Sequence, residues 1–396
     1  MLDKVKELAK KYEAEMIELR RYFHQNPELS WQETETTKRI AAELEKMGCK
    51  ILQVGFGGTQ CGVLAEIVGG KPGKCVALRA DIDALPLQDE KDVPYKSKKP
   101  GVMHACGHDA HASMLLMAAR ILCDIKDELH GTVRLIFQPA EEYGMRHGAS
   151  PMIEEGVLNG VDAIFGFHIW TVTESGVFEW RHGPIMAANA GWDLSIHGKG
   201  GHGSAPEFAV DPSIAAARIL DAFQTIISRE LSPKDTAVIS LGGMKTSSHV
   251  FNIIPERVEM TGCVRSFSSA VQEQISAAMA RVVEGVCTTH RCKADFVFKP
   301  YVPATVNNAA CADILRDAAI DVLGADKVRE AESVMGSEDF SMFLEKIPGS
   351  FAFMGCRSEE KKSTHPHHSP KFDVDESVMK NGAEIHVQTV LKFLNS

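Results

Sequence analysis

Three short apolar runs in the first half of the chain each end in side chains that bind protons or metal ions. Cys75–Ala80 is followed by Asp81 and Asp83, Val133–Ala140 is followed by Glu141 and Glu142, and Ala163–Phe167 is followed by His168. Such runs, alternating with helical segments, are typical of buried parallel strands. Ligands of an open α/β sheet bind at the carboxyl ends of its strands, so we expect these side chains to share one site.

A dense group of metal-binding residues lies between the first two runs. Met103–His111 contains one cysteine and three histidines, and Ala112–Cys123 is free of glycine and proline and rich in helix formers, which predicts a buried helix. Asp109 is a suitable N-cap for that helix. Cys106 and His108 would then lie in the loop at its positive end, where the pKa of a thiol is lowered. A buried cysteine with capping histidines is the alternative interpretation.

Each of these side chains has a plainer interpretation when it is taken alone. Asp81 and Asp83 are suited to capping a loop, and His168 stands among apolar neighbours, as a core histidine does. Adjacent Glu141 and Glu142 are harder to explain, because two like charges near the interior repel each other and need a cation. Because all of these side chains follow predicted strands, we favour a shared functional site over separate structural roles.

A second group of histidines, His365, His367 and His368, lies near the C-terminus. One of them could complete a metal site, or the tract could lie on the surface with incidental metal affinity. The chain has no Gly-x-Ser-x-Gly elbow, His-Glu-x-x-His helix or Walker loop. A two-metal hydrolase accounts for these features together, with cysteine, histidine and glutamate as ligands and a spare glutamate acting on the bound water.

Composition narrows the class of protein. The chain has 396 residues, which predicts two domains, and its net charge of −10 without a basic block argues against binding nucleic acid. The N-terminus has mixed charges and does not resemble a signal peptide, and no apolar run is long enough to span a membrane. Ten scattered cysteines form no disulfide framework. We therefore expect a cytoplasmic enzyme.

The pattern of elements predicts one domain inserted into another. Residues 1–47 indicate two helices interrupted near His24, which we interpret as a turn residue. From about Gly183, a strand-helix-strand-strand-helix-strand order predicts a small α+β domain. The expected organisation is a catalytic domain of residues 1–183 and 300–396, with the inserted domain at 184–299. The catalytic domain is α/β, with a mixed, largely parallel sheet flanked by helices.

Four segments resemble one family of metal-dependent amidohydrolases over nearly the whole chain and in the same order. They are Arg79–Pro86, Met103–Asp109, Gln138–Glu142 and Gly200–Pro206. The family contains hippurate hydrolases, bacterial N-acyl-amino-acid deacylases and plant auxin-conjugate hydrolases, and is related to aminoacylases and zinc carboxypeptidases. The resemblance implies that the inserted domain is a lid that also forms a homodimer or homotetramer.

The resemblance also implies roles for individual residues. By motif position, the ligands of two divalent ions, manganese or zinc, are Cys106, His108, Glu142, His168 and His368. Glu141 becomes the general base, and Asp83 orients a ligand. The last ligand is His368 because it directly precedes Ser369. A tetrahedral oxyanion needs a hydrogen-bond donor, for which His202 is the candidate, although it could be a turn histidine in a glycine-rich loop.

The expected reaction is the hydrolysis of N-acyl-L-amino acids with a free α-carboxylate. Similarity to related enzymes suggests that Asn252 and Arg265 hold that carboxylate, since a guanidinium can do so bidentately. The alternatives are a salt bridge for Arg265 and a turn cap for Asn252. Dipeptidase or carboxypeptidase activity with the same two-metal site stays open, as does a binding protein without activity. Apolar residues near the expected cleft suggest room for an aryl or medium acyl group; they are Met145, Trp170, Phe340 and Met354.

Overall fold

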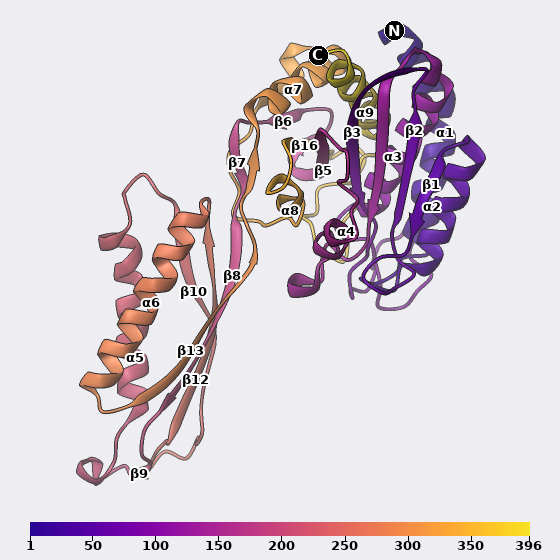
Figure 1. Cartoon of the computed structure of the whole chain (residues 1–396). Coiled ribbons are helices and arrows are strands. Elements are labelled where there is room, and N and C mark those ends of the chain that lie inside the picture. The colour runs from indigo at the N-terminus through magenta and orange to yellow at the C-terminus, as the bar shows by residue number, and fades with distance from the viewer. The chain divides into compact units, whose positions relative to one another are not determined.

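The computed structural model describes residues 1–396 and divides them into two compact units (Figure 1). Unit 1 comprises Met1–Ile185, Val306–Glu332 and Asp339–Ser396, and unit 2 comprises Met186–Thr305 and Ser333–Glu338. The sequence placed the boundaries after residues 183 and 299. The structure divides the chain after residues 185 and 305, and it adds the short segment 333–338 to unit 2.

Unit 1 is built on an eight-stranded sheet with the strand order β1-β2-β4-β3-β5-β16-β6-β15. The strands are β1 Lys50–Val54, β2 Val63–Val68, β3 Lys71–Asp81, β4 His130–Gln138, β5 Ala163–Glu174, β6 Phe178–Trp180, β15 Val328–Glu330 and β16 Gly349–Arg357. The four central strands, β4, β3, β5 and β16, are mutually parallel. Strand β2 is antiparallel to both β1 and β4, and β6 is antiparallel to β16. The predicted mixed, largely parallel sheet is confirmed.

Helices flank this sheet and supply much of the core. They are α1 Leu2–Gln25, α2 Thr34–Met47, α3 His108–Asp124, α4 Ala149–Glu154, α7 Ala309–Leu323, α8 Ser341–Leu344 and α9 Met379–Leu394. Helix α3 packs against β3 on one side and against α1 and α9 on others, so almost every side chain from His108 to Leu122 is buried. The predicted buried helix is therefore confirmed.

The start of α3 differs from the expectation in one respect. The helix begins at His108, and its N-cap is Gly107, which has a φ of +90° that suits glycine. Asp109 is fully buried within the first turn, where Oδ2 lies 2.9 Å from Arg20 Nε and 2.7 Å from His24 Nδ1. The interpretation of His24 as a turn residue is wrong, because His24 is buried in the last turn of α1 and binds Asp109. These residues anchor α3 to α1.

Unit 2 contains a four-stranded antiparallel sheet in the order β10-β12-β8-β13. Its strands are β8 Ala188–His197, β10 Ala237–Thr246, β12 Arg257–Ser266 and β13 Lys293–Val302. Helices α5 Pro212–Thr225 and α6 Ser269–Thr289 pack against each other and against the sheet (Figure 1). Helix α5 is followed directly by a π-helical turn, Ile226–Glu230.

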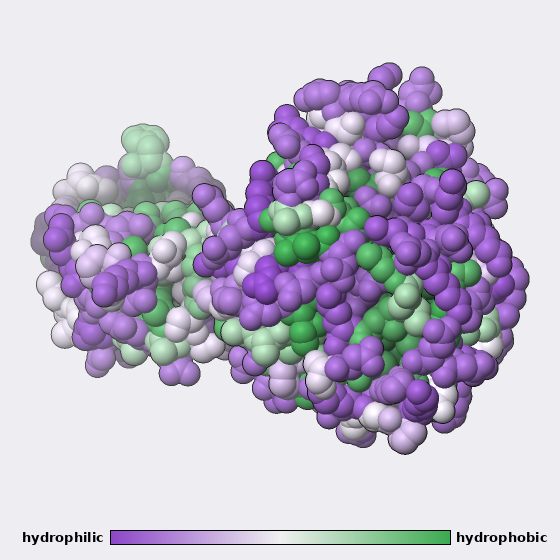
Figure 2. Space-filling model, turned by 90° about the horizontal axis from the view of Figure 1, so that it is seen from above, coloured by the Kyte–Doolittle hydropathy of each residue, from purple (hydrophilic) through white to green (hydrophobic).

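Two short two-stranded sheets lie outside the two main sheets. Strand β9 (Gly201–His202) pairs with β11 (Ile253–Ile254) in unit 2, and β7 (Gly183–Met186) pairs with β14 (Thr305–Asn307). In Figure 2, hydrophilic residues cover most of the visible face and apolar residues form smaller groups between them. None of the helices is both long and apolar enough to span a membrane.

Candidate active site

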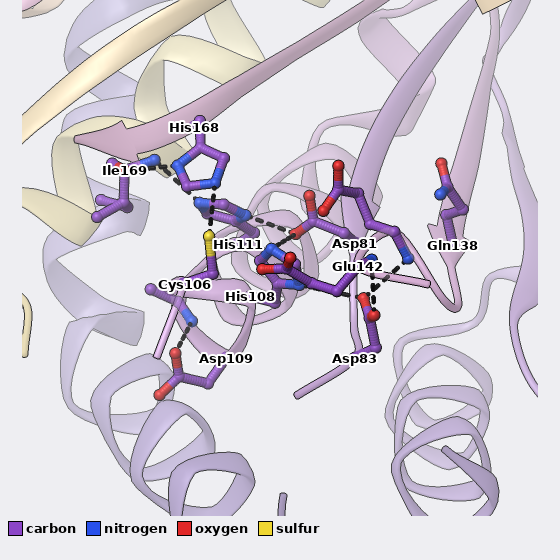
Figure 3. A network of polar contacts seen from close by, with 12 residues as sticks. Asp81, Asp83, Cys106, His108, Asp109, His111, Gln138, Glu142, His168 and Ile169 are labelled. Carbon is purple, nitrogen blue, oxygen red and sulfur yellow. Dashed lines mark hydrogen bonds and ion pairs between the residues drawn. The ribbon is translucent and has the colours of Figure 1, made fainter. Parts of the chain in front are cut away.

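The carboxyl ends of β3 and β4, the start of α3 and the central part of β5 converge on one cluster in unit 1 (Figure 3). Candidate ligand atoms lie within 4.8 Å of one another in three overlapping groups: Cys106 with His108 and His168, Cys106 with Glu142 and His368, and His108 with Glu141 and Glu142. The shared members connect the three groups. The structure thus brings together the five side chains that were predicted as ligands, with Glu141 beside them.

Asp83 is the central hydrogen-bond acceptor of the cluster. Oδ1 accepts from His108 Nδ1 and from the backbone N–H of Glu141, each at 3.1 Å. Oδ2 accepts from Ser30 Oγ at 2.7 Å and from the backbone N–H of Glu142 at 3.0 Å. Burial opposes ionisation, but these donors and the charge of His108 lower the pKa of Asp83. A single carboxylate therefore fixes the imidazole of His108 and the backbone of both glutamates.

The imidazoles of His108 and His168 present their Nε2 atoms to the cluster. Because His108 Nδ1 donates to Asp83, its Nε2 is left buried without a hydrogen-bond partner. His168 Nδ1 donates to the carbonyl of Ile169 at 2.5 Å, and its Nε2 lies 3.4 Å from Cys106 Sγ. Burial lowers the pKa of His168 well below that of a free histidine. An orphaned Nε2 beside a thiol and carboxylates fits the coordination of a metal ion.

The charge of the cluster also suits a bound cation. We expected the start of α3 to lower the pKa of the Cys106 thiol, but burial and the neighbouring Glu142 and Glu141 raise it well above the usual value. Burial opposes protonation of His108, yet Asp81 and Asp83 raise the pKa of this imidazole to about 10. Burial and nearby carboxylates act together on the thiol, whereas at the imidazole the carboxylates outweigh burial. A bound cation would reverse both effects, because it favours thiolate and neutral imidazole.

His111 supports the cluster without a free nitrogen of its own. The backbone N–H of Ile169 donates to Nε2 at 2.9 Å, so Nδ1 carries the proton and donates to Asp81 Oδ1 at 2.6 Å. Asp81 in turn pairs with Arg79. Sequence analysis missed this role, although the spacing of three residues from His108 along α3 would have placed both rings on one helix face.

The structure distinguishes the three C-terminal histidines. His367 Nε2 donates to the carbonyl of Ile169 at 2.9 Å and its Nδ1 lies 3.2 Å from the Thr171 hydroxyl, so both nitrogens are engaged. His365 is exposed. His368 adopts a φ of +61°, and its Nε2 lies 3.0 Å from Glu142 Oε1. The His367 ring lies beside that of His168, with 5.2 Å between their centroids, but His368 is the one of the three that places a ring nitrogen against a predicted ligand carboxylate.

Glu33 holds the turn before the two glutamates and was not predicted. Ala140 has a φ of +54°, a left-handed conformation that is uncommon for a residue with a Cβ. Glu33 Oε1 accepts a hydrogen bond from the backbone N–H of Ala140 at 2.8 Å. Burial, and then the charge of Asp83, raise the pKa of Glu33 to about 8. No pattern in the sequence connects Glu33 with a turn more than a hundred residues away.

The other predicted residues lie in unit 2. His202 is exposed, and its Nδ1 accepts from the backbone N–H of Ser204 at 3.2 Å, which leaves the proton on Nε2. The carbonyl of Asn252 accepts from the backbone N–H of Gly203, so Asn252 and His202 are neighbours. Arg265 donates from Nη1 to Ser337 Oγ at 2.8 Å.

Arg265 lies far from His202 within unit 2. In the sheet, Arg257 pairs with His197 and Arg265 pairs with Asn189, so the two arginines mark opposite ends of β12. Strand β9, which holds His202, follows His197 at the Arg257 end (Figure 1). Eight residues of strand correspond to roughly 26 Å. One copy of unit 2 therefore does not bring Arg265 together with His202 and Asn252.

The sequence profile of peptidase family M20/M25/M40 matches residues 77–392. The chain belongs to this family. "Thermostable carboxypeptidase 2" of Saccharolobus solfataricus is 44% identical over all of this chain and 99% of its own length. "N-acetylcysteine deacetylase" of Bacillus subtilis is 40% identical over 93% of this chain and 94% of its own length. The crystal structure of a dinuclear metal-binding M20 peptidase from Bacillus subtilis superposes on this chain with a TM-score of 0.85 and 36% sequence identity. The match covers 98% of this chain and 99% of the B. subtilis chain. The M20 chain described here is a metal-dependent hydrolase of amide bonds.

Replacing Glu33 by glutamine should stabilise the protein increasingly as the pH rises. Because the pKa of Glu33 is raised in the folded state, the folded protein keeps a proton that the unfolded chain loses above about pH 4.5. Stability is therefore lost between pH 4.5 and 8 in wild type, and a neutral amide at this position removes that loss while keeping the acceptor for Ala140. The melting temperature of Glu33→Gln minus that of wild type should be at least about 3 °C larger at pH 8 than at pH 5.

The matched control is Glu35→Gln, at an exposed position two residues away. Its melting temperature relative to wild type should be the same at both pH values. An equally flat difference for Glu33→Gln would mean that Glu33 is ionised in the folded protein.

Proposed function

We propose that the chain hydrolyses the amide bond of N-acyl-L-amino acids and releases a carboxylic acid and a free amino acid. The observation that carries the proposal is the single cluster of thiol, imidazole and carboxylate groups around adjacent Glu141 and Glu142. The deacetylase relative supports an acyl group as the part removed, and the carboxypeptidase relative supports the alternative of peptide hydrolysis at the same site. We also place the protein in the cytoplasm, as a homo-oligomer formed through unit 2.

Two divalent ions complete this site in the proposal, as in the M20 peptidase of known structure. Their ligands would be Cys106, His108, Glu142, His168 and His368. The mixture of sulfur, nitrogen and oxygen atoms suits manganese or zinc. When bound, the ions supply Lewis-acid chemistry, which lowers the pKa of water and polarises a carbonyl oxygen.

Glu141 is the proposed general base. Its backbone N–H is fixed by Asp83, beside the Glu142 carboxylate that belongs to the ligand cluster. From this position Glu141 takes a proton from the attacking water and passes it to the leaving amine. The reaction needs both transfers, because an amide nitrogen leaves as an amine.

The residues of unit 2 bind the substrate from two different copies of the chain. Because His202 Nδ1 accepts a hydrogen bond, its Nε2–H can donate one to the oxyanion of the tetrahedral intermediate. Asn252, its neighbour, acts with it. Arg265 lies at the other end of the same sheet, so Arg265 and the His202–Asn252 pair reach one small substrate only if they come from different subunits. A dimer satisfies this requirement.

The two adjacent glutamates should respond differently to the same substitution. Glu141→Gln keeps the ligands, so its metal content should stay at that of wild type while kcat falls at least about a hundredfold. Glu142→Gln weakens a ligand and should lose metal. Metal analysis and steady-state kinetics measure both, with exposed Glu154→Gln as the control. The opposite pattern would exchange the roles of Glu141 and Glu142.

Mixed dimers test whether His202 acts on the partner's site. A His202→Ala chain and a Glu141→Gln chain are each expected to be nearly inactive alone. In a heterodimer, one of the two sites combines an intact Glu141 with an intact His202, so activity should recover to a substantial fraction of wild type. Verified heterodimers that stay inactive would show that His202 acts in its own chain or has no role.

The substrate class is tested with matched ligands. An N-acetyl amino acid should be hydrolysed faster than its carboxamide, and Arg265→Ala should lower kcat/KM for the acid roughly tenfold to a hundredfold by removing a charged hydrogen-bond donor. Arg257→Ala, on the same strand, is the control. Equal cleavage of acid and carboxamide would contradict the deacylase proposal, and faster cleavage of dipeptides would favour the peptidase.

A further inference from the structure

Two cysteines of unit 1 are in contact at the end of α3 that lies away from the ligand cluster. Cys49 lies between α2 and β1, and Cys123 lies in the last turn of α3. Their Sγ atoms are 3.5 Å apart, although the two residues are 74 positions apart in the sequence. His108 begins the same helix, and the 15 residues from His108 to Cys123 correspond to roughly 22 Å. The proposed mechanism uses neither thiol.

The surroundings of Cys49 leave room for the two sulfur atoms to come closer. In a disulfide the sulfur atoms are about 2 Å apart, so the pair must close by about 1.5 Å. Gly48 ends α2 with a φ of +83°, and a Cβ placed on it would meet nothing within 4 Å. Strand β1, which follows Cys49, is the outermost strand of the sheet. The segment that carries Cys49 can therefore move over this distance without displacing a central strand.

The two thiols differ in exposure and in acidity. Cys123 is partly exposed, whereas Cys49 is only 7% exposed. A hydrogen bond from the Cys49 thiol lowers the pKa of Cys123, and the charge of Lys126 acts in the same direction against burial. The same hydrogen bond, and then burial, raise the pKa of Cys49. Because the thiolate is the nucleophile, Cys123 is the thiol that reacts first with a reagent from solvent.

From this geometry we infer that Cys49 and Cys123 form a covalent modification site, at which a small-molecule disulfide oxidises the pair to an intramolecular disulfide. The Cys123 thiolate attacks one sulfur of the reagent, forms a mixed disulfide and releases a first reagent thiolate. Cys49 loses its proton and attacks the sulfur of Cys123, which breaks the mixed disulfide and releases the second thiolate. The released thiolates take up the two protons that the protein loses. Two protein thiols are thus oxidised, and one reagent disulfide is reduced to two thiols.

The new bond would stabilise the part of the chain that holds the ligand cluster. It closes a loop from Cys49 to Cys123 that contains β2, β3 and two of the predicted ligands, Cys106 and His108. A cross-link across a long loop stabilises a protein mainly by restricting the unfolded chain. It also ties the last turn of α3 to the start of β1. Under reducing conditions the pair stays open, and a rise in small-molecule disulfides converts the enzyme to a more stable form.

The experiment treats the metal-loaded full chain with oxidised glutathione. The protein is then denatured with a thiol-alkylating reagent, and its peptides are mapped by mass spectrometry without reduction. Wild type should yield a linked Cys49–Cys123 peptide and retain eight of its ten alkylatable thiols. Oxidation should raise the melting temperature by at least about 4 °C, and dithiothreitol should reverse the rise. Ten free thiols, or a stable glutathione adduct on Cys123 of wild type, would overturn the inference.

Serine variants test the order of the two steps. Cys49→Ser should keep a glutathione adduct on Cys123, because the second thiol is missing, whereas Cys123→Ser should leave Cys49 unmodified. Neither variant should gain stability on oxidation. Cys75→Ser is the matched control, because Cys75 is another partly exposed thiol and lies on β3. This control should form the linked peptide and show the same rise as wild type. Adducts on Cys49 rather than Cys123 would overturn the assigned order, and the wild-type map tests the site even if a variant fails to fold.

Discussion

Four hydrogen bonds to the buried Asp83 carboxylate organise the candidate active site. Their donors come from the α1–α2 connection, from α3 and from the turn after β4, which are separate parts of the chain. An ionised carboxylate accepts such bonds at about twice the strength of a neutral acceptor. Without Asp83, the Nδ1 of His108 and the backbone N–H groups of Glu141 and Glu142 would all lose their partner. The protein's own hydrogen bonds therefore orient these ligand atoms.

A second buried network lies beneath this one and holds the start of α3. The Arg20 guanidinium contacts Asp109, Asp373 and Glu376, and it also lies near His24. Charges that are removed from water are tolerated here because each one has partners of opposite sign. Asp109 directly follows His108, so the position of His108 depends on Asp83 at its ring and on Arg20 through its neighbour. Two independent anchors limit the movement of one imidazole.

The elements were predictable from the sequence because their signals are local. Apolar runs and helical spacing located β3, β4, β5 and α3, and the polar residues at strand ends located the cluster. The contribution of tertiary partners was not predictable in this way. Asp109 looked like an N-cap because its partner Arg20 is distant in sequence, and the same reason hid Glu33, which acts on Ala140. The thiol of Cys106 was assigned a low pKa from the helix terminus alone, whereas burial, and then the carboxylates that folding brings close, raise its pKa. Charge effects over a few ångströms require the folded geometry.

The insertion of unit 2 has a consequence for the order in which the chain is synthesised. Strand β5 ends at Glu174, but its parallel partner β16 begins at Gly349, after all of unit 2's main segment has been made. During translation, one edge of the central strands therefore lacks its neighbour, and such an edge is open to pairing with other chains. His368 emerges later still. The nascent chain carries most of the ligand cluster on an incomplete sheet, and the last strand closes that edge before the segment after it supplies the final histidine.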